Sequence, residues 1–488
     1  MDTAAVTQFI AQQKLSEADA LHIRSFYNRR NFQYAWFDSD GLTEQARSFW
    51  NLSSYKSDSV NQNQALEKEM KKLMAEDSLA INAADTKSLQ TELTLTHYFI
   101  GFMNREYNGN KAVVKDLENF IPRKKADLLS LADSFANEKN ANQAYEEANQ
   151  SFKLLKDQLP KYISIVKAGG WPAVPADEKV FSKLSTPNPA FASVKKRLNI
   201  SGELSAADTS AVYDSALSNA VKVFQTSVGI TPDGKLTKRT LEELNVPAKK
   251  RLEQILINLD RMRWLPEGEN GPLIVTNIPE FKLYVYEGNK EAFNMNVVVG
   301  KEGHSTVIFT GKLNQVVFAP YWNLPESIVR KEILPAMNRN SNYLASHNME
   351  IVENGSVPRI RQKPGGNNSL GKVKFLFPNE FDIYFHDTPA KSLFNKDQRS
   401  YSHGCIRLSD PVKMANYLLK DDAEWPATRI DSAMNGQKEK TVVLPKAVPV
   451  LITYYTAWVG ADGKLNFRDD IYLHDAAVAK KMFTTVAM

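Results

Sequence analysis

The chain has 488 residues, more than one ordinary hydrophobic core organises, which indicates about three domains. Its apolar content of 43% and charged content of 24% are those of a soluble globular protein, and it lacks the run of about 18 apolar residues that a transmembrane helix requires. The net charge of +5 is too small to be typical of nucleic-acid binding and suits a protein that meets an anionic polymer.

Residues 1–185 predict a helical scaffold domain. Apolar residues recur at helical spacing from Phe152 to Val166, and the run Gly169-Gly170-Trp171-Pro172 ends that pattern. Pro160 lies inside the pattern, so it either kinks one helix or divides two. Aromatic clusters such as Tyr34-Ala35-Trp36-Phe37 could contact glycan, but large aromatic side chains dominate core burial, which favours packing.

Residues 186–246 predict a small three-helix domain. Its second helix carries an apolar stripe from Ala220 to Val228, Gly229 follows as a C-cap, and Thr237 can cap a third, short helix. The run A-V-K-V-F-Q-T-S-V-G-I-T-P-D-G-K-L-T-K-R-T-L-E-E-L-N resembles the peptidoglycan-binding domain found beside many wall enzymes. The resemblance implies glycan binding. The family often has a second glycine where this chain has Thr237, so a plain spacer is the alternative.

Residues 247–268 continue with an amphipathic helix that has one apolar stripe. This helix is expected to pack back on the scaffold, which would make the small domain an insertion. From residue 269 the apolar period changes to that of strands, with turn signals between short runs. Strands are expected at 281–285, 296–300, 307–309, 315–319, 375–377, 383–386, 441–444 and 448–458. The sequence therefore predicts a β-rich, sandwich-like catalytic domain over 269–480, within a multi-domain α+β chain.

Between residues 321 and 371 the strand signal lapses. Structureless loops of this length are uncommon unless they are functional, so the segment is interpreted as a capping or lid subdomain. Trp322 and Asn323 are its expected substrate-facing residues, although Trp322 could be a core residue. A disordered surface insertion is the alternative.

The stretch from Ile383 to Asp410 contains the chemistry. It holds the only cysteine, Cys405, together with His386 and His403. An imidazole can take the proton that a thiol must lose to become a nucleophile, and Arg407 adds positive charge beside it. Gly404 permits a tight turn, so its amide and that of Cys405 could face a developing oxyanion. A buried structural cysteine is the alternative; a structural zinc site would require further ligands, and the chain has no second cysteine.

The run H-D-T-P…S-H-G-C-I-R-L resembles the active-site signature of the L,D-transpeptidases, the cysteine enzymes with a YkuD-type domain that remodel peptidoglycan. The resemblance implies that Cys405 is the nucleophile and that His386, 19 residues upstream, is the general base. The Asp387 backbone carbonyl would orient the imidazole without any demand on the Asp387 side chain. The remaining implied site residues are Gly404 and His403 on the catalytic side and Arg407, Tyr384, Tyr401, Ser402, Trp322 and Asn323 on the substrate side.

The resemblance further implies acyl transfer from a tetrapeptide stem, with release of the terminal D-alanine and formation of a 3-3 cross-link, without a metal or organic cofactor. Expected partners are peptidoglycan stem peptides and glycan, with acylation by carbapenems, no nucleic acid and a monomeric chain. The alternatives are an L,D-carboxypeptidase or protein-detaching hydrolase with the same cysteine, a zinc peptidoglycan hydrolase, and a non-catalytic wall-binding scaffold.

The start Met1-Asp2-Thr3-Ala4-Ala5 has neither the basic region nor the apolar run of a secretion signal. Taken literally, this start indicates a cytoplasmic protein. The family resemblance instead implies a periplasmic protein in a mature form whose signal has been replaced by Met1.

Overall fold

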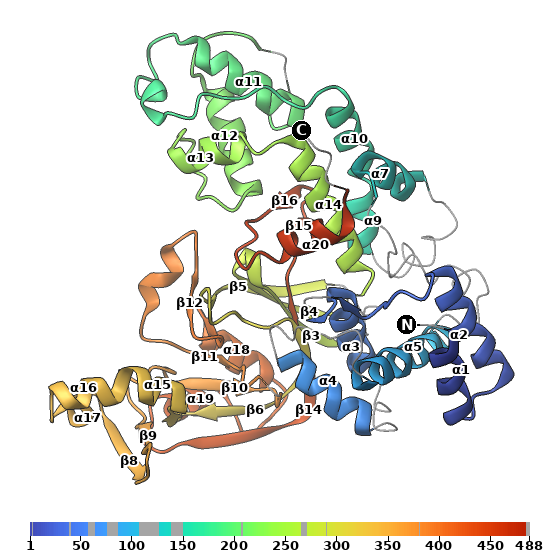
Figure 1. Ribbon diagram of the computed structural model, residues 1–488. Helices are drawn as coiled ribbons and strands as arrows, with labels where there is room; N and C mark the ends of the chain where they lie inside the picture. The colour runs from blue at the N-terminus through green and yellow to red at the C-terminus, as the bar shows by residue number, and fades with distance from the viewer. Residues whose placement is uncertain are drawn as a thin grey trace. The chain divides into compact units, whose positions relative to one another are not determined.

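The computed structural model describes residues 1, 3–38, 41–56, 64–75, 86–106, 126–137, 150–205, 208–264, 271–288, 290–379 and 381–484. The chain forms two compact units, one made of Met1–Gly268 with Tyr455–Met488 and the other of Glu269–Tyr454 (Figure 1). The boundary predicted at residue 480 is therefore wrong. Residues 455–480 belong to the helical unit because their strands pair with each other and contact α9 and α14. No helix in the described parts of the chain has the length and apolar content needed to cross a membrane.

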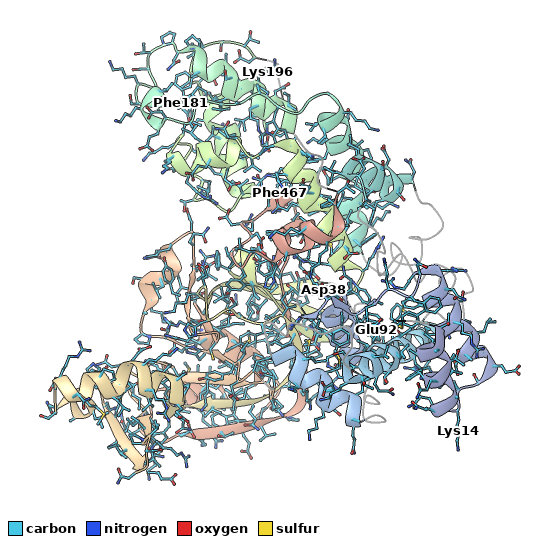
Figure 2. All side chains as sticks on the ribbon, in the orientation of Figure 1. Lys14, Asp38, Glu92, Phe181, Lys196 and Phe467 are labelled. Carbon is cyan, nitrogen blue, oxygen red and sulfur yellow. The ribbon has the colours of Figure 1, made fainter. Side chains whose placement is uncertain are left out.

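The first part of the helical unit packs around aromatic side chains. Trp36, Phe49 and Phe99 are buried, and the rings of Trp36 and Phe99 meet edge to face at 5.2 Å. Packing of the 34–37 cluster is thus confirmed. Glu92 lies in the same region (Figure 2). The elements are α1 (Thr3–Gln12), α2 (Glu17–Arg29), β1 (Phe37–Asp38), β2 (Gly41–Leu42), α3 (Glu44–Lys56), α4 (Gln64–Ala75), α5 (Thr86–Glu106), α7 (Leu128–Asn137), α9 (Gln150–Lys156) and α10 (Leu159–Lys167).

Pro160 divides two helices, because it occupies the first turn of α10, where its missing N–H costs no hydrogen bond. The next helices share one apolar core, and each begins at a polar cap. Asp214 accepts a hydrogen bond from the Leu217 amide, and Thr237 accepts one from the Thr240 amide as predicted. These elements are η3 (Glu178–Phe181), α11 (Pro189–Ser201), α12 (Ser215–Ser227) and α13 (Lys238–Leu244).

Helix α14 (Ala248–Met262) continues the helical unit and contacts α7, α9 and α10. It also contacts the C-terminal elements β15 (Ala457–Val459) and α20 (His474–Met482), and β15 pairs with β16 (Leu465–Phe467). Segments far apart in the sequence therefore pack together in one helical unit.

The second unit is built on one continuous mixed sheet with the strand order β12-β5-β13-β11-β10-β6-β14-β3-β4. Because β4 also pairs with β5, the sheet closes on itself. A true β-sandwich has two separate sheets, whereas this β-rich domain has one closed sheet. The strands expected at 307–309 and 315–319 are the two ends of β6. The strands are β3 (Pro272–Asn277), β4 (Lys282–Glu287), β5 (Lys290–Gly300), β6 (Phe309–Phe318), β10 (Val373–Leu376), β11 (Phe385–His386), β12 (Ser400–Ser402), β13 (Ile406–Leu408) and β14 (Lys440–Thr453).

The remaining elements of this unit connect the strands. They are η4 (Ile278–Glu280), η6 (Lys391–Asn395), α18 (Pro411–Leu418) and α19 (Ala427–Met434). The segment from 321 to 371 forms a separate subdomain with a small sheet in the order β7-β9-β8 and its own apolar core. Its elements are β7 (Trp322–Asn323), α15 (Glu326–Ile328), the π-helical turn η5 (Val329–Ile333), α16 (Leu334–Arg339), α17 (Tyr343–Ser346), β8 (Met349–Glu353) and β9 (Arg359–Gln362).

Candidate active site

Cys405 ends a tight turn between β12 and β13, two strands that both pair with β5. Gly404 has a φ of +114°, a conformation that favours glycine. The Ser402 hydroxyl bridges the turn, since it donates to the Cys405 carbonyl at 2.5 Å and accepts from the Gly404 amide at 3.1 Å. Thr306 donates to the Gly404 carbonyl at 2.7 Å. The cysteine is thus presented by a backbone that hydrogen bonds hold on both sides.

His386 lies at the end of β11, which runs parallel to β13 with His386 opposite Arg407. The imidazole is buried, and its Nδ1 lies 2.5 Å from the Asp387 carbonyl oxygen. A carbonyl only accepts, so Nδ1 carries the proton and Nε2 keeps its lone pair. Burial and then the Arg407 charge lower the pKa of His386 to about 3, although Asp387 opposes the shift. The imidazole is therefore neutral at physiological pH.

The Asp387 side chain has a structural position that the sequence did not predict. Its carboxylate accepts from the Lys372 amide at 2.9 Å, the Thr388 amide at 2.7 Å and the Lys391 ammonium at 2.7 Å. Gly371, with a φ of +61°, lies against this carboxylate so closely that a Cβ there would collide with it. The Asp387 side chain therefore has a separate structural role, because it anchors the loop whose backbone carbonyl contacts His386.

The Cys405 thiol is half-buried and makes a weak hydrogen bond to the Asp382 carbonyl at 3.5 Å. Burial raises the pKa of Cys405 above its usual value, while hydrogen bonds from Tyr384 and the Arg407 charge act in the opposite direction. At rest the site therefore holds a neutral thiol and a neutral imidazole. A thiol and an imidazole in these states can exchange a proton as a bond to the sulfur forms, which needs no thiolate at rest.

Arg407 and Tyr384 surround the thiol. The Nε atom of Arg407 is buried and has no hydrogen-bond acceptor among the described residues. Burial lowers the pKa of Arg407, and the nearby Cys405 raises it. The Tyr384 ring lies 5.8 Å from the His386 ring, and burial and then the Cys405 charge raise the pKa of its hydroxyl. An unsatisfied buried donor is costly, so Arg407 offers a site for a substrate oxygen.

Two histidines and a glutamate lie on one side of the turn. His403 Nε2 is 3.4 Å from Glu332 Oε1, and its ring meets that of His304 edge to face at 4.9 Å. Burial lowers the pKa of His403, although Glu332 opposes this. Glu332 belongs to η5, so the subdomain of residues 321–371 reaches the cysteine turn. No sequence motif marked Glu332, His304 or Thr306.

The remaining predicted substrate residues differ in burial and in position. Ser402 is only 2% exposed and bonds within the turn, so the substrate-binding role predicted for it does not fit its position. Trp322 packs against the core of the 321–371 subdomain, and Asn323 is exposed on β7. Tyr401 is 40% exposed on β12. The Gly404 amide is engaged by Ser402, whereas the Cys405 amide makes no hydrogen bond within the described residues. Those residues also contain no group of three His, Cys, Asp or Glu that could hold a metal ion.

Three family models match the chain. Residues 271–452 match "L,D-transpeptidase catalytic domain" (YkuD), residues 22–159 match "Scaffold domain", and residues 187–244 match "Putative peptidoglycan binding domain". A curated relative from Haemophilus influenzae, named "Putative L,D-transpeptidase", is 32% identical over 265 residues, which cover 50% of this chain and 53% of the relative. The chain thus spans about half the length of this relative.

Solved structures show fainter similarity. An L,D-transpeptidase from Stackebrandtia nassauensis is 13% identical with a TM-score of 0.24, covering 58% of this chain and 96% of that one. An L,D-transpeptidase from Mycobacterium smegmatis is 14% identical with a TM-score of 0.22, covering 37% of this chain and 58% of that one.

Proposed function

We propose that this protein cross-links peptidoglycan by acyl transfer through Cys405, because residues 271–452 match the model of the L,D-transpeptidase catalytic domain (YkuD). One observation supports this most. Cys405 directly precedes β13, whose Arg407 pairs in register with a buried, neutral His386. A nucleophile, a base and an unsatisfied cationic donor thus occupy two neighbouring strands, which is the set that acyl transfer requires.

In the first half-reaction, the Cys405 sulfur attacks the carbonyl carbon of the diamino acid at the third position of a tetrapeptide stem. The thiol proton passes to His386 Nε2, and the Cys405 amide hydrogen-bonds to the oxyanion. Collapse breaks the C–N bond, the imidazolium returns its proton to the departing D-alanine amine, and a thioester remains. Loss of one oxyanion donor would cost about 2.7–4 kcal/mol of transition-state stabilisation.

In the second half-reaction, an amine of another stem attacks the thioester. His386 accepts the amine proton and returns one to the Cys405 sulfur as the C–S bond breaks. The product is an amide between two third-position residues, a 3-3 cross-link, and the free thiol is regenerated. Arg407 Nε lies in position to hold a backbone or carboxylate oxygen of the donor stem.

The partners and the location follow from this substrate. Peptidoglycan stems and glycan are the proposed partners, and the cell wall or periplasm is the proposed location. Since β-lactams carry a strained acyl group, carbapenems are expected to acylate the same thiol. The subdomain of residues 321–371 is proposed to cover the bound stem, because Glu332 reaches His403 beside the cysteine.

Intact-protein mass after exposure to a carbapenem tests the nucleophile. The wild type is expected to gain one adduct, and Cys405→Ala none, with the adduct mapped to the peptide that contains residue 405. Lys331→Ala, a surface change in η5 on the neighbouring subdomain, serves as the matched control and keeps the adduct.

Turnover of a purified tetrapeptide stem tests the reaction. Cross-linked dimer with release of D-alanine is expected. Tripeptide and D-alanine without dimer, even with an added acceptor stem, would replace the cross-linking proposal with hydrolysis. A folded wild type that forms neither an adduct nor any product would overturn the assignment of Cys405 as nucleophile.

A further inference from the structure

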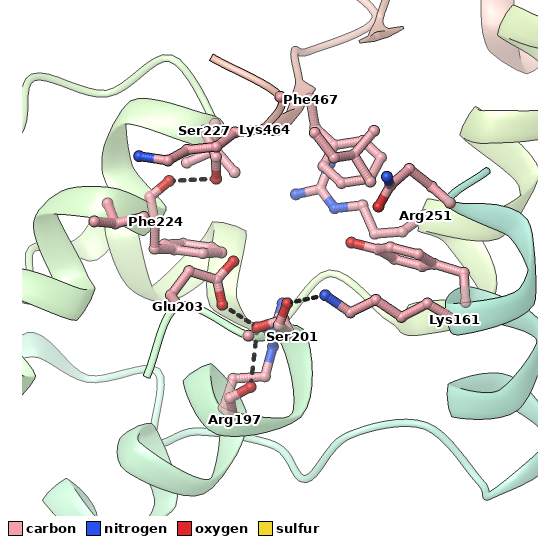
Figure 3. A pocket seen from close by; sticks show the side chains of 16 residues that line it. Lys161, Arg197, Ser201, Glu203, Phe224, Ser227, Arg251, Lys464 and Phe467 are labelled. Atoms are coloured by element: carbon pink, nitrogen blue, oxygen red, sulfur yellow. Dashed lines mark hydrogen bonds between the residues drawn. The ribbon is translucent and has the colours of Figure 1, made fainter. Parts of the chain in front are cut away.

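A cavity of about 230 Å³ opens in the helical unit, and its lining does not include the residues that hold Cys405 (Figure 3). Four parts of the unit line it: α10, the C-terminal ends of α11 and α12, Arg251 of α14, and the loop and strand that form one side of the β15–β16 hairpin. The three-helix domain supplies only part of this wall. A site here therefore depends on segments more than two hundred residues apart, which no local motif would reveal.

The cavity is lined by more cations than anions. Among the described residues that line it, the cationic side chains are Lys161, Arg197, Arg251 and Lys464, and Glu203 is the carboxylate. Glu203 already accepts a hydrogen bond from the Ser201 hydroxyl, and Arg251 already bonds to Glu243. The remaining field in the cavity is positive and favours an anion.

Arg197 is a buried cation with no direct ion pair among the described residues. It is 2% exposed, and its Nε donates to the Leu244 carbonyl at 2.9 Å while Nη1 donates to the Ser201 hydroxyl at 2.5 Å. Its guanidinium lies 3.6 Å from the Trp171 ring centre. Carboxylates act on it without forming a direct ion pair: burial lowers the pKa of Arg197 to about 10, and the charge of Glu203 opposes this shift. A carboxylate from a ligand would offset this cost.

The same cavity has flat apolar walls. Phe224 and Phe467 line it, and the Tyr162 ring meets that of Phe467 at 5.9 Å. Figure 3 shows Phe224 and Phe467 on opposite sides of the opening, with Arg197 and Lys161 below and Lys464 above. The complementary ligand has a carboxylate attached to a small apolar or sugar group.

We propose that this cavity binds such a carboxylate-bearing group of the cell wall, with its carboxylate between Arg197 and Lys464 and its apolar part against Phe224 and Phe467. The assignment of the ligand to the cell wall rests on the function proposed above and on the peptidoglycan-binding match of residues 187–244. The charge and shape of the cavity are observations that do not depend on that assignment. The group is either the free carboxylate of a stem peptide or an acidic substituent of the glycan. The cavity would hold the enzyme on its polymer while Cys405 works on a separate stem.

Amide hydrogen exchange on the full chain tests the proposal, with Cys405→Ala present so that no ligand is consumed. The probes are a stem tetrapeptide and peptide-free glycan strands that retain their lactyl carboxylates. Protection is expected in residues 197–204 and 460–468. Protection by the peptide assigns the source to stems, and protection by the strands alone assigns it to glycan. Protection by neither probe at millimolar concentration would overturn the proposal.

Lys464→Glu places a negative charge at the cavity mouth. This change is expected to lower the affinity for the protecting ligand at least about tenfold, equivalent to about 1.4 kcal/mol of binding free energy. Lys238→Glu is the matched control, because both lysines are exposed and each lies about 4 Å from a carboxylate, Asp462 for Lys464 and Glu242 for Lys238. Equal affinities of the two variants would contradict the site. In a protein that keeps Cys405, the Lys464→Glu variant should still form the carbapenem adduct. Failure of the cavity proposal can therefore be distinguished from failure of the catalytic proposal.

Discussion

Two arginines, the buried Arg261 in the helical unit and the half-buried Arg407 in the second unit, have opposite electrostatic surroundings. In the helical unit, Arg261 of α14 donates to Glu44 at 2.6 Å and also bonds to Asp475 of α20. Burial alone would lower the pKa of Arg261, but these two carboxylates raise it above its usual value. In the second unit, burial lowers the pKa of Arg407, and the Nε atom of Arg407 has no hydrogen-bond acceptor among the described residues.

The difference separates structure from chemistry. Arg261 joins three helices that are distant in sequence, and its charges are compensated within the protein, so it contributes to stability. Arg407 is held beside a neutral imidazole and a protonated thiol with an unused donor, so the protein keeps that donor for a ligand. A change at the first centre should therefore reduce stability and leave chemistry intact, and a change at the second should do the reverse.

The largest effect should come from His386→Ala. Loss of a general base is expected to reduce tetrapeptide turnover by as much as about 10⁴-fold, close to 5.5 kcal/mol, with the Cys405 adduct forming correspondingly slowly. Steady-state turnover and adduct rate measure this. His347→Ala removes an exposed histidine of α17's C-terminal cap and should stay within about threefold of wild type. Equal rates for both variants would remove His386 from the mechanism.

Arg261→Met should give the next effect, on stability alone. The buried Asp475 and the half-buried Glu44 would lose their shared cation, so the helical unit should lose about 3–5 kcal/mol of unfolding free energy. Denaturant unfolding measures this, and carbapenem acylation below the transition should remain at the wild-type rate. Lys167→Met breaks an exposed pair with Asp133 and should cost less than about 1 kcal/mol. An unchanged midpoint for Arg261→Met would contradict the structural role.

The third test concerns pH and the buried Glu92 of the helical unit. Burial raises the pKa of Glu92 from 4.5 to about 7, although amide hydrogen bonds from Ala35 and Trp36 oppose the shift. The folded state therefore binds the proton more tightly than the unfolded state. This contribution is fully present below about pH 4.5 and is lost as the pH rises to about 7, by at most about 3 kcal/mol.

Denaturant midpoints at pH 4.5 and pH 8 measure that contribution. The Glu92→Gln variant cannot ionise at this position, so the difference between its two midpoints should be smaller than the wild-type difference. The rate of Cys405 acylation should show the same pH dependence in the wild type and in Glu92→Gln. If the Glu92→Gln variant shows the same difference between its two midpoints as the wild type, the pH dependence belongs to other groups.

Arg407→Lys should give the smallest effect and the sharpest contrast with Arg261. A hydrogen bond to a charged group contributes about 1.5–3 kcal/mol, and lysine cannot reproduce the guanidinium fork, so turnover should fall about ten- to hundredfold. Unfolding free energy should change by less than about 1 kcal/mol, since Nε has no partner to lose. Arg359→Lys on exposed β9 is the control. A loss of stability without a loss of turnover would make Arg407 a second structural arginine.

Local patterns determined much of the architecture. The helical N-terminal region, the caps at Asp214 and Thr237, and the alternation that buries Leu283 and Val285 all depend on residues within a few positions of one another. The family also followed from a short run, because a cysteine on a glycine turn after a histidine strand is a local signal. The expected contact between His386 and the Asp387 carbonyl needed only adjacent residues.

Only the tertiary structure decided the rest. The sequence indicates a strand up to Trp458 and a hairpin turn at Asp462-Gly463, but it does not show that this hairpin contacts α9 and α14, so the domain boundary was misplaced. Burial of Ser402, the approach of Glu332 to His403, and the burial of Arg197 against the Trp171 ring arise from residues far apart in the chain. Burial, charge compensation and cavities are properties of what surrounds a side chain in space, and a linear pattern specifies only its neighbours along the chain.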